Sequence, residues 1–189
     1  MRWRGMLLVA LLGTAYAEES VPICFNYGCA AEATAVFSDM QLAWVREMIT
    51  GAVSPERERI RIALAVGQLY EWAGQQTPVA ADRAGNYADD GENGSMDCID
   101  HSTTTTRFLG LMEKRGWLHY HRVLVPQRRT RFLLSQHFSA AIEELGPVRD
   151  VEHPAPERYV VDSWFVDNGQ PAVILPLEEW LDWGGPDVN

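Results

Sequence analysis

The stretch "GSMDCIDHSTTTT", residues 94–106, sets Cys98 between two aspartates at the start of a predicted helix. Apolar residues at helical spacing, such as Phe108, extend this helix from about residue 95 to residue 115, and Gly116 is a typical terminator. The threonine run has poor helix propensity, because a β-branched side chain loses rotamer freedom against the preceding turn. We therefore expect tertiary packing to hold this helix.

The sequence before this helix predicts two further helices. One covers about residues 40–50, with a serine or an aspartate just before it as a cap. The other covers residues 55–73, with Ser54 as N-cap and Pro55 at the first helical position. Residues 75–94 have no apolar period and predict a long surface loop. The apolar face of the second helix is expected to contain Ile60, Ala63, Leu64, Leu69 and Trp72.

After Gly116 the apolar period changes from 3.6 residues to 2, which is typical of strands. The predicted strands are "WLHYHRVLV", "RFLLSQHFSAAIEEL", "RYVVDSWFV" and "PAVIL", with turns at "PQRRT" and at "DNG", residues 167–169. Helices followed by strands indicate an α+β fold, with helices packed on an antiparallel sheet. We expect residues 18–93 and 94–189 to form a single compact domain.

The first 17 residues have the three-part pattern of a signal peptide. Two arginines precede a short apolar run, and small residues end in Ala15-Tyr16-Ala17, an A-x-A cleavage pattern. The run is too short for a transmembrane helix, which needs about 20 apolar residues. We therefore expect residues 1–17 to be removed and the protein to be periplasmic or secreted. An uncleaved amphipathic anchor is the alternative.

The chain has three cysteines, and two of them flank a short loop. Cys24 and Cys29 enclose "FNYG", which contains the turn formers Asn26 and Gly28. Because disulfides persist in exported proteins, we expect these two to pair, with two free buried thiols as the alternative. Cys98 is then a lone thiol, which is either buried and inert or retained for its reactivity.

The charge balance argues against two classes of partner. The sequence has 26 acidic and 16 basic residues, a formal net charge of −10. Nucleic acids and anionic lipids are bound mainly through clustered lysine and arginine. The basic segment "RVLVPQRRTR" is expected to form a solvated hairpin rim. No nucleic acid partner is therefore predicted, and the oligomeric state is unknown from the sequence.

Reactive cysteines are found at helix N-termini, because unpaired N–H groups and the helix dipole stabilise the thiolate. The same N–H groups can donate to an oxyanion. A base and an orienting group are also needed. His137 begins one predicted strand, and Asp162 lies inside the next, where an unpaired carboxylate would be costly. If these strands are neighbours and the Cys98 helix packs on their common face, the three side chains meet.

This series of a helix-starting cysteine, a strand-opening histidine and a strand aspartate followed closely by tryptophan resembles the transglutaminase-like superfamily, most nearly the bacterial transglutaminase-like cysteine peptidases. The resemblance covers residues 94 to about 175. It implies a papain-like core with Cys98 as nucleophile, His137 as base and then acid, and Asp162 orienting the imidazole.

The resemblance further implies hydrolysis or acyl transfer at an amide bond of a protein, peptide or other substrate, through an acyl-enzyme. We expect no cofactor and no metal. The threonine run after the cysteine departs from the family pattern, in which alanine and leucine are common there. Residues 18–93 match no pattern of the family. The choice of substrate therefore does not carry over.

Several alternatives stay open. The second hypothesis is a catalytically silent binding or scaffold module that uses Trp164, Trp180 and Trp183 as a contact surface. A metal-dependent hydrolase built on His119 and His121 is a third hypothesis. For single residues, Asn86 or Asn93 is either an oxyanion donor or a turn former, and Asp97 and Asp100 are either calcium ligands or helix caps.

Overall fold

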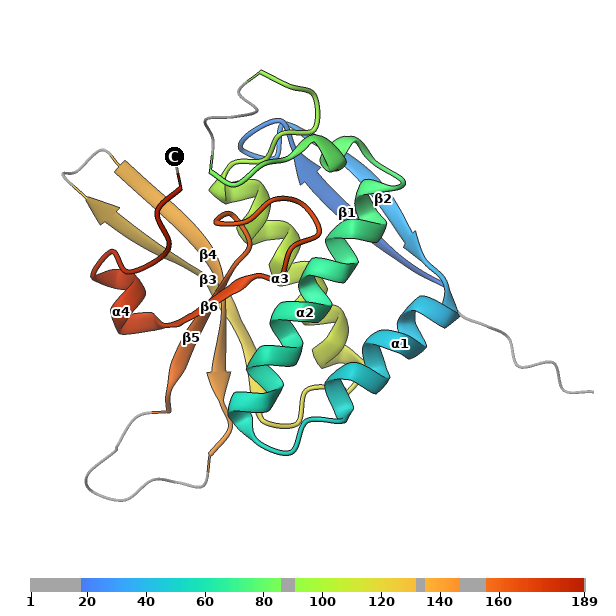
Figure 1. The fold of residues 1–189 in the computed structure, drawn as a ribbon, viewed down its shortest axis with the longest axis vertical. Helices are drawn as coiled ribbons and strands as arrows, with labels where there is room; N and C mark the ends of the chain where they lie inside the picture. The colour runs from blue at the N-terminus through green and yellow to red at the C-terminus, as the bar shows by residue number, and fades with distance from the viewer. Residues whose placement is uncertain (1–17, 86–90, 132–134, 147–155, 189) are drawn as a thin grey trace, which may run out of the picture.

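The structure, a computed structural model, describes residues 18–85, 91–131, 135–146 and 156–188. Helices dominate the first part of the chain and an antiparallel sheet the second (Figure 1). The predicted α+β fold is confirmed. The predicted signal peptide, residues 1–17, lies outside the described residues. None of the described helices is long and apolar enough to cross a membrane.

An antiparallel hairpin begins the described chain. β1 (Glu19–Phe25) pairs with β2 (Ala31–Phe37) and the two form a sheet of their own. Pro22 interrupts the apolar pattern of β1, so the sequence pattern gives little indication of this strand. Proline is tolerated in β1 because each strand of a two-stranded sheet has a free edge.

Both predicted helices before residue 75 are present. α1 (Asp39–Thr50) begins with a capping box in which Ser38 and Gln41 exchange hydrogen bonds. α2 (Pro55–Gly74) begins after Ser54, whose side chain accepts the N–H of Arg57.

The prediction of the α2 core face was wrong in part. Ile60 and Leu64 are 53% and 42% exposed. Ala63, between them in sequence, is only half-buried. The apolar residues that α2 buries lie on an adjacent stripe, and they are Ile62, Ala65, Val66, Leu69, Tyr70 and Ala73. The stripe also contains a buried carboxylate, Glu58, which the apolar pattern could not indicate.

The segment predicted as a long loop contains a short 3₁₀ helix, η1 (Pro78–Ala81). Residues 86–90 of this segment lie outside the described residues. α3 (Cys98–Lys114) begins at the cysteine and ends just before Gly116. Its buried side chains Phe108, Leu109 and Met112 join the main core, which provides the tertiary packing expected for the threonine-rich helix.

The second sheet has four strands in the order β3, β4, β5, β6, all antiparallel. Their bounds are β3 (His121–Arg131), β4 (Ser135–Glu144), β5 (Arg158–Asp162) and β6 (Val173–Pro176).

One predicted turn of this sheet was wrong. "PQRRT" belongs to β3, whose pairing with β4 shifts register between Leu124 and Gln127, where Pro126 has no N–H to donate.

The other predicted turn, "DNG", is present, because the N–H of Gln170 donates to the carbonyl of Asp167 at 3.0 Å. It is not a tight hairpin, since β5 already ends at Asp162 and β6 begins at Val173.

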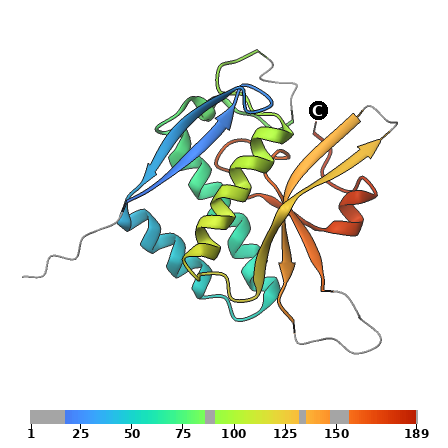
Figure 2. The same cartoon turned by 180° about the vertical axis from the view of Figure 1, so that it is seen from behind.

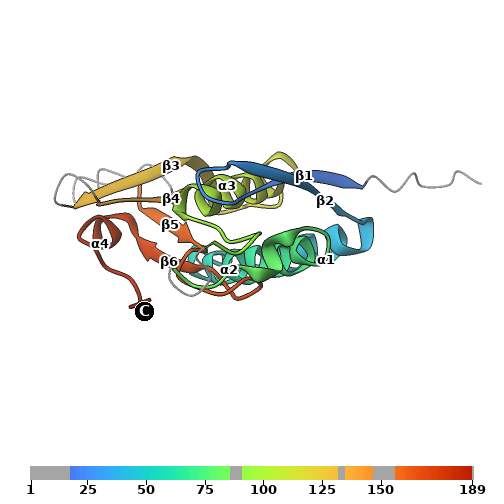
Figure 3. The ribbon, with the colours of Figure 1, turned by 90° about the horizontal axis from the view of Figure 1, so that it is seen from above.

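The four-stranded sheet carries a different layer on each face. Ala140, Ile142 and Val161 belong to the main core together with α2 and α3. Val160 packs instead with Phe165 and with Trp180 of α4 (Leu177–Leu181), in a second, smaller cluster. Figure 2 shows α3 lying beside the strands, and Figure 3 shows α4 and α1 at opposite ends of the molecule.

Candidate active site

Cys98 is the first residue of α3, and its helix turn is fixed by two carboxylates. Asp97 is the N-cap and accepts the N–H groups of Ile99 and Asp100, both at 3.0 Å. The side chain of Asp100 accepts the N–H of Asp97 at 3.1 Å, which completes a capping box. The backbone of Cys98 is therefore held between two mutually bonded residues.

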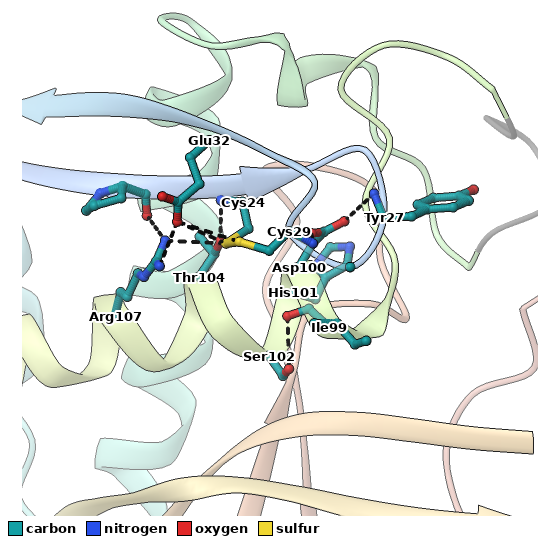
Figure 4. The surroundings of a disulfide bond; sticks show 12 residues. Cys24, Tyr27, Cys29, Glu32, Ile99, Asp100, His101, Ser102, Thr104 and Arg107 are labelled. Atoms are coloured by element: carbon teal, nitrogen blue, oxygen red, sulfur yellow. Dashed lines mark hydrogen bonds and ion pairs between the residues drawn. A yellow bond between two sulfur atoms is a disulfide. The ribbon is translucent and has the colours of Figure 1, made fainter.

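The disulfide loop of the β1–β2 hairpin lies against this helix end (Figure 4). The predicted bond between Cys24 and Cys29 is confirmed, with Cα atoms 4.7 Å apart. Asn26, Tyr27, Gly28 and Cys29 have φ angles of 64°, 63°, 63° and 58°. Left-handed conformations are unfavourable for residues other than glycine, so contacts from elsewhere must stabilise this loop.

Those contacts come from the two capping aspartates. Asp100 accepts the N–H groups of Tyr27 and Cys29 at 2.8 and 2.5 Å. Asp97 accepts the N–H of Gly28 at 3.0 Å. Burial and the nearby Asp97 nevertheless raise the pKa of Asp100 to about 6. The two carboxylates thus serve as helix caps and loop anchors, which is the capping alternative and not the calcium one.

His137 and Asp162 form a buried pair on the neighbouring strands β4 and β5. The ring Nε2 is 2.7 Å from Asp162 Oδ2, and the Trp180 indole N–H donates to the same oxygen at 2.9 Å. Because an ionised carboxylate only accepts, Nε2 carries the proton and Nδ1 of a neutral ring keeps its lone pair. Within the described residues, Nδ1 makes no hydrogen bond.

Aromatic rings surround this imidazole. The ring centroids of Trp164, Phe165 and Trp180 lie 4.7, 5.7 and 5.7 Å from that of His137. The sequence singled out Trp164 and Trp180 only as a possible contact surface. A buried indole needs an acceptor, which is a usable signal, but the sequence does not say which strand α4 faces.

The sulfur of Cys98 lies at the edge of β4 beside His137. Sγ is 4.0 Å from the carbonyl oxygen of Gln136, and the N–H of Phe138 also reaches it. β5 pairs with β4 only along residues 140–143, so this part of the β4 edge is open to the α3 N-terminus. No hydrogen bond joins the sulfur to the imidazole in the described part of the chain.

The expected common face for the three residues was wrong. α3 packs on the sheet face of Ala140 and Val161, whereas His137 and Asp162 alternate to the opposite face beside Trp180. Side chains alternate along a strand, so residues one position apart point to opposite faces. Cys98 therefore approaches the pair past the sheet edge.

The thiol of Cys98 is less acidic than its position in the sequence suggested. Burial raises its pKa to about 11, and the carboxylates of Asp97 and Asp162 act in the same direction. The backbone N–H of Phe138 favours the thiolate but does not compensate for them. Cys98 is half-buried and carries its proton at neutral pH.

The other histidines have different partners. Nδ1 of His101 is 2.9 Å from Ser163 Oγ and Nε2 is 3.2 Å from Asp82 Oδ2, so this ring does not serve Cys98 as a base. Nδ1 of His121 is 2.8 Å from Glu58 and Nε2 is 3.3 Å from Arg59. His121 is thus already engaged.

The hypothesis of a metal site finds no support in this part of the molecule. His119 is exposed and lies before β3. Among the described residues, the one cluster of three possible metal ligands is the disulfide pair with Glu32, and its sulfurs are bonded to each other.

The two asparagines considered as oxyanion donors have separate outcomes. The side-chain oxygen of Asn93 accepts a hydrogen bond from Asn26 at 3.1 Å, which is the loop role. Asn86 lies outside the described residues.

Comparison of the chain with models of protein families, with curated proteins and with solved structures gave no match.

Proposed function

We propose that this protein is an exported thiol hydrolase or acyltransferase that acts on amide bonds through Cys98, His137 and Asp162. The observation that carries the proposal is the 2.7 Å bond between His137 Nε2 and Asp162, which leaves Nδ1 without a hydrogen-bond partner among the described residues. The one free thiol of the chain, Cys98, lies against the backbone of Gln136, the residue that precedes His137. The disulfide at the site agrees with export.

The chemistry follows from these positions. Nδ1 of His137 takes the proton of Cys98 as Sγ attacks the amide carbonyl carbon, and Asp162 stabilises the imidazolium. The imidazolium then protonates the leaving amine, the C–N bond breaks and a thioester remains on Cys98. Water or an amine, deprotonated by His137, attacks the thioester and restores the thiol.

The helix start supplies an oxyanion donor. The N–H of Cys98 is at the first position of α3, where backbone N–H groups have no partner within the helix. An N–H there points at the carbonyl oxygen of a substrate held on the sulfur.

The raised pKa decides the type of thiol catalysis. Because burial raises the pKa of Cys98 to about 11, a resting thiolate–imidazolium pair is not the ground state of this site. The proton must leave during attack, so His137 acts as a general base.

A silent binding module is the second candidate, and two observations favour it. The sulfur forms no hydrogen bond to the imidazole within the described chain, and the raised pKa of Cys98 makes the thiol a poor nucleophile. Such a module would use the partly exposed Trp164 and Trp183 as contacts. The proposed triad and this alternative differ in whether His137 assists the thiol.

Alkylation by iodoacetamide, followed by intact mass, separates the two candidates because Cys98 is the one free cysteine. If His137 is a base, wild-type protein reacts at pH 7 faster than the His137→Ala variant, which behaves as a plain thiol of high pKa. Equal rates at every pH would contradict the triad and favour the silent module.

A panel of peptide and amide substrates then tests turnover. Cys98→Ala should abolish any hydrolysis, whereas a chelator should leave it intact. Hydrolysis that survives in Cys98→Ala would contradict the proposed nucleophile.

A further inference from the structure

A second buried histidine connects the two halves of the proposed site. His101 is 3% exposed, and its partners Asp82 and Ser163 are 0% and 3% exposed. Its ring reaches Ser163 Oγ through Nδ1 at 2.9 Å and Asp82 Oδ2 through Nε2 at 3.2 Å. Because all three side chains are buried, we look for the role of His101 in its contacts within the protein.

Each partner of His101 is next to a residue of the site. Asp82 Oδ1 accepts the N–H of Met96 at 2.9 Å, two residues before Cys98. Ser163 directly follows Asp162, which ends β5. One imidazole therefore spans from the segment that leads into the nucleophile to the strand end that carries the carboxylate.

The network continues into the helices. Ser163 Oγ is 2.9 Å from Thr105 Oγ1, and Thr105 Oγ1 is 3.1 Å from the hydroxyl of Tyr70. Tyr70 donates to the carbonyl of His101 at 3.3 Å. His101 and its partner Ser163 are thus connected by hydrogen bonds to Tyr70 of α2 and Thr105 of α3.

We propose that His101 is a positioning residue, which holds the start of α3 and the end of β5 in register so that Cys98 and the His137–Asp162 pair stay within reach. This inference rests on the proposed function, because it assigns His101 to the geometry of that site. The inference goes beyond the proposed function because His101 contacts neither the sulfur of Cys98 nor a substrate.

The charge of the ring matters to the link. Burial opposes the imidazolium, but Asp82 raises the pKa of His101 above its ordinary value, and Asp162 and Asp100 act in the same direction. The Tyr70 hydroxyl that packs against the ring is neutral, because burial raises its pKa. The imidazolium forms an ion pair with Asp82 across 3.2 Å and can also donate through Nδ1 to Ser163, whereas the neutral ring has no charge for Asp82.

The direction of the pH effect follows. A histidine whose pKa is raised by folding stabilises the folded protein fully below its unfolded pKa. That contribution is lost as the pH rises through the folded pKa. The positioning by His101 should therefore be strongest at low pH and disappear in alkaline solution.

Two variants of His101 each keep one of its two contacts and remove the other. Glutamine places an amide near the former Nε2, so His101→Gln retains a contact to Asp82 alone. Asparagine mimics Nδ1, so His101→Asn retains a contact to Ser163 alone. Neither spans both partners. His121→Gln is the matched control, because His121 is also buried and paired with a carboxylate, Glu58.

The experiment measures alkylation of Cys98 by iodoacetamide from pH 6 to pH 10 in the folded proteins. At pH 6 we expect the alkylation rate of both His101 variants to be lower than that of wild type by about tenfold or more, since small displacements at a site have large effects on rate. The ratio of each variant's alkylation rate to the wild-type rate should approach one as the pH rises. His121→Gln should keep the wild-type rate at every pH.

Two results would overturn the inference: a ratio for the His101 variants that does not change with pH, or one that matches His121→Gln. If the His101 variants do not fold, Ser163→Ala removes one end of the link and should give the same pH-dependent loss. A failure of the proposed function is seen separately, because His137→Ala would then react like wild type.

Discussion

Two buried histidine–carboxylate pairs lie at opposite ends of the same two strands. His121 begins β3 and pairs with Glu58 at 2.8 Å, whereas His137 lies near the start of β4 and pairs with Asp162 at 2.7 Å. The distances and the burial are alike. The second nitrogen differs: that of His121 is 3.3 Å from the guanidinium of Arg59, and that of His137 has no hydrogen-bond partner in the described residues.

The carboxylates differ in the same sense. Glu58 also accepts the N–H groups of His119 and Tyr120 at 2.6 and 2.9 Å, so it holds the backbone before β3 in place. Asp162 receives its second strong bond from a side chain, the indole of Trp180. A buried histidine–carboxylate pair is therefore not in itself a catalytic feature. We propose that the neighbour of the remaining ring nitrogen decides whether such a pair only stabilises the fold or also takes part in a reaction.

The largest expected effect is the loss of hydrolysis in the Asp162→Asn variant. Asp162→Asn can present its amide N–H to Nε2 of His137, which leaves the ring in the wrong tautomer. We expect hydrolysis to fall by about 10⁴-fold, the loss typical of an orienting aspartate replaced by asparagine in a triad. The measurement is kcat on a substrate found with wild type.

Glu58→Gln is the control for this change, because it makes the same chemical replacement in the other pair. Once corrected for the folded fraction, its kcat should equal that of wild type. A comparable loss in both variants would remove the distinction between the pairs.

The next effect is on the stability of the fold and concerns the His121–Glu58 pair. Glu58→Gln removes the buried carboxylate that binds the His121 ring and the N–H groups of His119 and Tyr120, and breaking a buried pair costs about 3–5 kcal/mol of unfolding free energy. Asp162→Asn should cost less, because the indole of Trp180 supplies only one bond there. Urea denaturation of both variants at neutral pH measures the difference.

The pH dependence of this stability has a definite sign. Burial alone would raise the pKa of Glu58, but hydrogen bonds from His121 and from two backbone N–H groups lower it overall. Its contribution is therefore complete above the ordinary glutamate pKa and is lost as the pH falls through the lowered value. Glu58→Gln should remove this acid-dependent part of the curve, and an unchanged curve would contradict the assignment.

The sequence predicted the helices better than the strands. Ser54 and Pro55 begin α2 as expected, because capping is local chemistry. The turn at "DNG" is present but does not form a tight hairpin, because Asp162 and Ser163 are fixed by distant groups, Trp180 and His101, and β5 stops where those bonds begin. Such contacts have no local signature.

The site shows the same division. The Cys24–Cys29 disulfide and the pairing of His137 with Asp162 were predicted from compartment and from the cost of an unpaired carboxylate. The pKa of Cys98 was not, since a helix N-terminus lowers it whereas burial raises it, and burial is a tertiary property. The role of Cys98 as nucleophile stays a prediction.

The third effect concerns the disulfide loop, residues 24–29, which contacts the start of α3. Replacing both Cys24 and Cys29 by serine opens a short loop, for which a disulfide contributes about 2 kcal/mol. The loop has four residues in the left-handed region, and it also loses the constraint that brings its N–H groups to Asp100. Thermal unfolding should show a lower Tm, and alkylation of Cys98 should change as its helix cap loosens. A wild-type alkylation rate would show that Asp97 and Asp100 suffice.

The smallest expected effect tests what Trp180 contributes to the His137–Asp162 pair. Trp180→Phe keeps an aromatic ring in the second core cluster but removes the N–H that bonds Asp162 at 2.9 Å. A hydrogen bond to a charged group contributes about 1.5 kcal/mol at the lower end, and the 3.3 Å bond from the N–H of Trp164 remains. We therefore expect kcat to fall about tenfold, which is about 1.4 kcal/mol, with the substrate KM unchanged. Because the buried indole also fills space, Trp180→Phe costs stability as well, and kcat must be compared at a temperature where both proteins are folded. If kcat falls as far as in Asp162→Asn, the indole and not the imidazole is the main partner of the carboxylate, and the contrast between the two histidine pairs lies in their packing.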